Sequence, residues 1–106
     1  MPYYDALLPL LGFEKQADHA WSNGNGLFLQ FDEAEPGARD YDRYGAGVNH
    51  IGFTAPSLSR VEAIREAMRA AGFEAPDIQL LSGASALFMK DPDGFRFEIS
   101  YCPEGV

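Results

Sequence analysis

The stretch that decides the fold is Phe88-Met89-Lys90-Asp91-Pro92-Asp93-Gly94-Phe95-Arg96-Phe97-Glu98-Ile99. Its centre, Asp91-Pro92-Asp93-Gly94, is a strong signature of a tight turn, because Asp and Pro favour turns and Gly tolerates a positive φ. We therefore expect two strands, at 86–90 and 95–101. Apolar and polar residues alternate along the second strand, so its aromatic face and the face that carries Glu98 lie on opposite sides of a sheet.

Upstream, residues 58–71 carry the pattern of an amphipathic helix. Apolar residues recur there at steps of three and four, at Leu58, Val61, Ile64, Met68 and Ala71. Ser59 and Glu62 form a capping-box pattern, and Gly72 supplies a left-handed stop. An alternating strand at 48–54 precedes the helix. This half of the chain is therefore predicted to run strand, helix and then three strands.

The first third of the chain repeats this order of elements. A short helical stripe stops at Gly12, and Gly12-Phe13-Glu14 matches Gly72-Phe73-Glu74 sixty residues later. Asn23-Gly24-Asn25-Gly26 takes the place of the second-half turn and also leads into an apolar strand. With that alignment Gln30 corresponds to Glu98. The sequence therefore predicts two copies of one helix-and-hairpin module.

The two copies form one predicted domain, 1–106. Module one occupies about 1–34, an acidic, glycine-bounded linker about 35–46, and module two about 47–103. The strand at 48–54 has no counterpart ahead of the first helix, so module one is expected to lack its first strand. A sheet edge left open in this way favours association, and we therefore predict a homodimer.

Composition limits the classes of partner. The chain has 106 residues, of which 46% are apolar and 23% charged, and its net charge is −8. This excess of acid argues against binding to nucleic acid or to an anionic membrane surface. It serves solubility or, alternatively, a preference for cationic ligands. Cys102 is the only cysteine, which excludes an intrachain disulfide and a multi-thiolate zinc site and makes a reducing, cytoplasmic setting the default.

His50, Glu98 and Gln30 are the residues that can carry chemistry. If Ile51 and Phe53 pack on the helix, His50 and Glu98 project together from the opposite face of the sheet. A neutral imidazole and a carboxylate that converge can bind a divalent ion, and Gln30 can add a weaker oxygen ligand. The alternative is a half-buried histidine bonded to a strand neighbour and a Glu98 paired with Arg96 or Lys90.

Three further side chains are predicted to line a ligand pocket: His19, Trp21 and Arg96. His19 shares strand parity with Trp21, and Arg96 shares the face of Glu98. For the first two the alternatives are a solvated turn histidine and a core tryptophan.

Several segments together resemble the glyoxalase/bleomycin-resistance/dioxygenase superfamily, whose fold is also called vicinal oxygen chelate. The resemblance lies in residues 3–8, 11–13, 48–54, 60–63, 70–73 and 88–99. It implies an α+β fold in which paired βαβββ modules form a curved, cupped mixed sheet. It also implies a divalent ion (Zn, Mn, Fe or Ni), held by a His on the first strand and a Glu or Gln on the last strand of each module. His50 and Glu98 match these positions in module two and Gln30 matches one in module one, whereas the first-module His has no counterpart.

The same resemblance implies the activity. We expect a metal-dependent lyase, isomerase or dioxygenase that acts on a small oxygenated metabolite, with Glu98 as a ligand that can double as a catalytic base. The alternative is a metal-free protein of the bleomycin-resistance type, which sequesters a small molecule and whose acidic charge suits a cationic guest. A third possibility is that the shortened chain is an inactive variant or an incomplete product of a longer reading frame.

Overall fold

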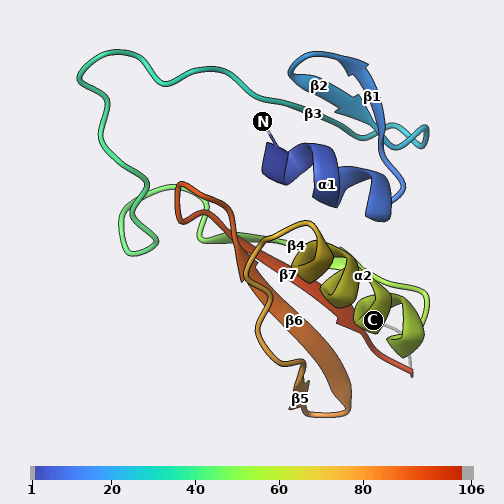
Figure 1. Cartoon of the computed structure of the whole chain (residues 1–106). Coiled ribbons are helices and arrows are strands. Elements are labelled where there is room, and N and C mark those ends of the chain that lie inside the picture. The colour runs from blue at the N-terminus through green and yellow to red at the C-terminus, as the bar shows by residue number, and fades with distance from the viewer. Residues whose placement is uncertain (1, 104–106) are drawn as a thin grey trace. The chain divides into compact units, whose positions relative to one another are not determined.

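A computed structural model describes residues 2–103, and the chain divides into two compact units, Met1–Asp40 and Tyr41–Val106. Each unit combines one helix with one sheet, which makes the protein α+β (Figure 1). The predicted fold class is therefore confirmed.

The first unit holds a helix and a three-stranded antiparallel sheet. Its elements are α1 (Pro2–Leu10), β1 (Glu14–Ala17), β2 (Ala20–Ser22) and β3 (Phe28–Gln30), and the strand order is β1-β2-β3. The apolar stripe of α1 is buried, at Tyr3, Tyr4, Leu7 and Leu8.

The second unit is a complete βαβββ module. Its elements are β4 (His50–Thr54), α2 (Leu58–Ala70), β5 (Gln79–Leu81), β6 (Ala84–Lys90) and β7 (Arg96–Tyr101). The strand order is β4-β7-β6-β5, with β4 parallel to β7 and the other pairs antiparallel. The helix lies along one face of this sheet (Figure 1). Its apolar stripe packs against β6 and β7, and the resulting core comprises Val61, Ile64, Met68, Leu87, Met89, Phe97 and Ile99.

The two helices end in the same way, which supports the internal repeat. In α1 the amide of Gly12 donates to the carbonyl of Pro9, and that of Phe13 to Leu8 at 3.0 Å. Sixty residues later the same two bonds close α2, from Gly72 to Arg69 and, again at 3.0 Å, from Phe73 to Met68. Gly12 and Gly72 have φ of +87° and +92°, the left-handed conformation that ends helices at glycine.

The turns that precede the last strand of each unit also match. The side-chain oxygen of Asn23 accepts from the amides of Asn25 and Leu27, at 2.8 and 3.2 Å. Asp91 Oδ1 accepts from Asp93 and Phe95 in the same pattern, at 2.9 and 2.8 Å. Each side chain thus closes an Asx turn ahead of a strand. Since Gln30 and Glu98 each lie four residues after the glycine that ends the turn, Gly26 or Gly94, they are equivalent positions.

Two local predictions are wrong. The capping residue of α2 is Ser57, whose side chain accepts from the amide of Arg60, and not Ser59. An N-cap residue has an extended backbone and directly precedes the helix, as Ser57 does. Ser59 already lies inside the first helical turn. The strand expected at 48–54 begins at His50, because the carbonyls of Val48 and Asn49 accept from the Tyr41 hydroxyl instead of joining a strand ladder.

Candidate functional site

The sheet of the second unit has one face that α2 does not cover, and we call this the open face. Along β7, Phe97 and Ile99 are buried on the helix side, whereas Arg96, Glu98 and Ser100 alternate with them and are half-buried. The parallel register places His50 beside Arg96 and Gly52 beside Glu98. Residues in register share a face, so His50 and Glu98 lie on the open face, on neighbouring strands and two residues out of register.

The Glu98 side chain leans toward β4. A Cβ atom added to Gly52 would lie 3.8 Å from Glu98 Oε2, so the carboxylate lies close to the backbone of the strand that carries His50. Within residues 2–103 Glu98 makes no ion pair, and neither Arg96 nor Lys90 neutralises it. Its oxygens therefore remain available as acceptors or ligands.

The hydrogen bonds of Asn49 orient the imidazole of His50. The side-chain amide nitrogen of Asn49 donates to the carbonyl of Arg43 at 2.9 Å, which leaves its oxygen directed to His50 Nδ1, also at 2.9 Å. An amide oxygen only accepts, so Nδ1 carries a proton, and in the neutral ring the lone pair then lies on Nε2. His50 is exposed, and its free nitrogen is of the kind that binds metal ions.

The other predicted site residues lie in the first unit. Gln30 is exposed at the end of β3, in register with Ala20. His19 is exposed in the turn before β2, and its carbonyl accepts from the amide of Phe31 at 2.8 Å. Trp21 is only 4% exposed, and Lys15 Nζ lies 5.7 Å from its ring centre. The metal role of Gln30 and the pocket roles of His19 and Trp21 stay predictions.

A pocket of about 270 Å³ opens in the second unit. It is lined by Glu74, Pro76, Phe88, Met89, Lys90 and Arg96. Arg96 is among the predicted pocket residues, whereas sequence reasoning missed Phe88, Lys90 and Glu74. The available signal was the turn at 91–94, because a hairpin closed there places Lys90 opposite Arg96. Two cations and one carboxylate give the lining an excess of positive charge, whereas the whole chain has a net charge of −8.

The donor set of the second unit fits half of a divalent metal site. His50 Nε2 and the Glu98 carboxylate are ligands that Zn²⁺, Mn²⁺ and Fe²⁺ accept, and such ions take four or more ligands. Within residues 2–103 no group of three or more His, Cys, Asp or Glu side chains forms a metal site. Further ligands would have to be of another type or come from another source.

A βαβββ module with a His on its first strand and a Glu on its last, both on the uncovered face, is the arrangement of the vicinal oxygen chelate class of protein. The family model described as the Glyoxalase/Bleomycin resistance protein/Dioxygenase superfamily matches residues 10–99. The chain therefore belongs to this superfamily.

Solved structures agree with this fold. A Bacillus halodurans protein classed by name with the glyoxalases is 23% identical, with a TM-score of 0.78, over 93% of this chain and 82% of that one. A glyoxylase/bleomycin resistance protein/dioxygenase domain from Frankia sp. EAN1pec is 20% identical, with a TM-score of 0.73, over 94% and 84% of the two chains. At these identities the likeness concerns the fold alone.

No curated protein matches the chain. Neither helix within residues 2–103 is long and apolar enough to cross a membrane.

Proposed function

We propose that this protein is a metal-dependent enzyme of the glyoxalase superfamily that acts on a small oxygenated metabolite on the open face. His50 Nε2 and the Glu98 carboxylate are two ligands of a divalent ion, which is Zn, Mn, Fe or Ni. The observation that carries the proposal is the direction of the Glu98 side chain, which lies close to Gly52 on the strand of His50 and has no ion-pair partner within residues 2–103.

The chain's own residues have distinct tasks in this proposal. A divalent ion would supply Lewis-acid stabilisation of negative charge on substrate oxygens. Asn49 holds the His50 ring so that Nε2 faces away from the strand neighbour. Glu98 is the catalytic residue, because a carboxylate ligand that is released from the ion can double as a base and accept a substrate proton. A role of Gln30, the equivalent of Glu98 in the first unit, as an oxygen ligand stays a prediction.

The metal content of the purified protein tests the proposal. Protein purified without chelator is expected to carry a stoichiometric divalent metal, measured by mass spectrometry of the elements. His50→Ala and Glu98→Gln should each lose it, whereas His19→Ala, which removes the other histidine of the chain, should keep it. Equal metal content in all four proteins would refute the ligand assignment.

A second candidate function is metal-free binding of a small molecule, and the pocket lined by Phe88, Lys90 and Arg96 favours it. The charge of that lining suits an anionic guest, although the net charge of the chain suggests a cationic one. A protein without metal that nevertheless binds small organic ions would support this second candidate.

We further propose that the protein works as a homodimer in the cytoplasm. Within residues 2–103, β3 pairs with β2 alone, so its other edge has no strand partner. Leu27 and Phe28 beside that edge are 47% and 67% exposed. An open edge with exposed apolar residues favours pairing with a second copy. The cytoplasmic setting rests on the single cysteine, Cys102.

A further inference from the structure

Three basic side chains form a row across the open face. The sheet register aligns His50 on β4 with Arg96 on β7, and Arg96 with Lys90 on β6. Like charges directly opposite each other on neighbouring strands destabilise a sheet. Within residues 2–103 neither Lys90 nor Arg96 has an ion-pair partner, and Arg96 is half-buried. An anion bound between the two cations would relieve their repulsion.

The pocket described above lies at this row. Lys90 and Arg96 both line it, and Phe88 supplies an aromatic wall. Glu74 also lines the pocket but forms no ion pair with either cation. The positive charge of the pocket is therefore not neutralised by the side chains that surround it in residues 2–103.

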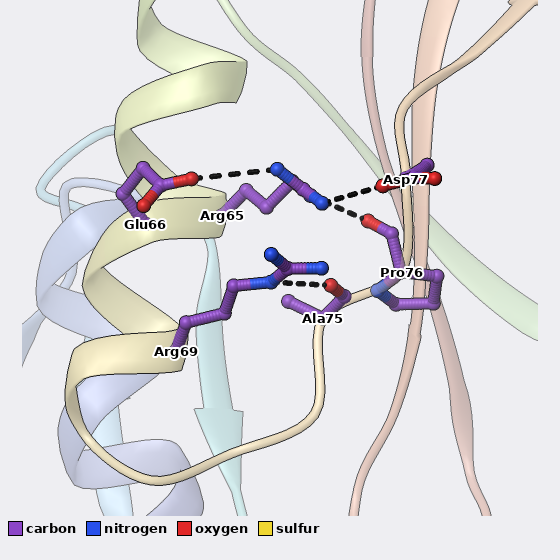
Figure 2. A network of polar contacts seen from close by, with 6 residues as sticks. All are labelled: Arg65, Glu66, Arg69, Ala75, Pro76 and Asp77. Carbon is purple, nitrogen blue, oxygen red and sulfur yellow. Dashed lines mark hydrogen bonds and ion pairs between the residues drawn. The ribbon is translucent and has the colours of Figure 1, made fainter.

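Two arginines of α2 hold the loop that forms the other wall. Arg65 donates to the carbonyl of Pro76 at 2.7 Å and to the carboxylate of Asp77 at 2.6 Å, and Arg69 donates to the carbonyl of Ala75 at 2.9 Å (Figure 2). The carbonyls of two consecutive residues are thus anchored to the helix. Glu74 and Pro76 are held on this loop, so the pocket has a preorganised wall rather than a free one.

We propose that this pocket binds the oxyanion of a small organic acid, with Arg96 and Lys90 as its anchors and Phe88 as its apolar wall. The guanidinium of Arg96 provides a fork of donors that matches a carboxylate or a phosphate-type group, and Lys90 adds a point charge. The register places Phe88 beside Glu98, so an acid held at the basic row extends toward Glu98. In assigning a substrate class to the proposed enzyme, this inference rests on the proposed function.

An NMR titration of the full chain in buffer with EDTA tests the oxyanion site. The probes, at constant ionic strength, are benzoate, phenylphosphonate, neutral benzamide and benzylammonium. We expect saturable shifts at Phe88, Lys90 and Arg96 with one or both acids and none with the neutral or cationic probe. The stronger of the two acids identifies a carboxylate or a phosphate-type ligand. Binding of all four probes alike, or of none, overturns the proposal.

Two variants and one matched control sharpen the result. Arg96→Gln and Lys90→Gln should each weaken binding of the acid about tenfold, because each removes a charge-assisted hydrogen bond. Arg60→Gln removes the same charge from the exposed surface of α2 and should leave binding unchanged. Without acid, Arg96→Gln should also unfold at a higher temperature than the parent, because it relieves the repulsion with Lys90. A parallel loss of binding in Arg60→Gln would contradict the assignment.

The chelator separates the two proposals. Binding of the acid in EDTA, together with a purified protein that carries no metal, would refute the metal-dependent function and leave the oxyanion site standing. If the parent protein carries a metal that His50→Ala loses, but binds none of the acids, the oxyanion site is refuted and the metal-dependent function stands.

Discussion

The Glu98 carboxylate lies close to Gly52 on the neighbouring strand, with Oε2 3.8 Å from the point where a Cβ atom would stand. The φ of Gly52 is not positive, so the backbone conformation does not require a glycine at this position. Its small size leaves room for the acidic side chain beside the strand that carries His50.

Substitution of Gly52 tests this relationship. Gly52→Ala places a methyl group in ordinary contact with Glu98, so it should change the free energy of unfolding by no more than about 0.5 kcal/mol and keep the bound metal. Gly52→Val needs more room and should displace the carboxylate, which lowers metal affinity about tenfold. Metal competition and urea unfolding of both variants measure the two effects. A Gly52→Val protein with parental metal affinity would contradict the role of Glu98.

Asn49 is expected to position His50. Asn49→Ala removes the acceptor at Nδ1, so the ring can rotate and exchange tautomers, and metal affinity should fall about tenfold. Nitrogen-detected NMR of the metal-free protein should show a neutral tautomer protonated at Nδ1 in the parent and a mixture in the variant. Asn25→Ala, in the turn of the first unit, is the matched control and should leave both readouts unchanged. An unaltered tautomer in Asn49→Ala would show that the hydrogen bond is not what orients the ring.

The cap of α2 can be tested with two serines two residues apart. Ser57→Ala removes the acceptor for the amide of Arg60 and should destabilise the protein by about 1 kcal/mol. Ser59 lies inside the first turn, and Ser59→Ala should cost much less or even stabilise the helix, because alanine is the better helix former. Chemical unfolding of both variants gives the comparison, and a larger loss in Ser59→Ala would restore the capping box expected from sequence.

The open edge of β3 predicts how the protein associates. Phe28→Lys places a charge beside this edge and should shift the protein from dimer to monomer, as charged residues do on natural edge strands. Leu80→Lys changes a residue that is 83% exposed on β5 and should leave the dimer intact. Light scattering over a range of concentrations distinguishes the two, and a parent protein that stays monomeric throughout would refute the homodimer.

Much of the fold is predictable because its signals are local. The turn at 91–94 and the glycine at 72 each dictate a backbone conformation within a few residues, and both act in the structure as their sequences predict. The α2 stripe likewise follows from helical periodicity. The cap at Ser57 was missed because Ser59 and Glu62 show the sequence pattern of a capping box, although Ser59 lies two residues after the true cap.

The candidate site was only partly predictable, because its parts meet through tertiary structure. Strand alternation was enough to place His50 and Glu98 on one face, provided that β4 pairs with β7 in parallel. The role of Asn49 depends on a bond to the carbonyl of Arg43, which no sequence pattern reveals. The pocket wall depends on Arg65 and Arg69, which read in sequence only as the polar side of a helix.

The ladder formed by β4, β7 and β6 has a consequence for how such a protein can diversify. The spacing between His50 and Glu98 is set by the hydrogen-bonded backbones of two neighbouring strands, which lie about 4.8 Å apart. No loop contributes to it. Mutation can therefore change the side chains around the cavity while the spacing of His50 and Glu98 stays the same. Four of the six residues that line the pocket lie on these same strands, so their side chains can be exchanged while the backbone that spaces His50 and Glu98 stays as it is.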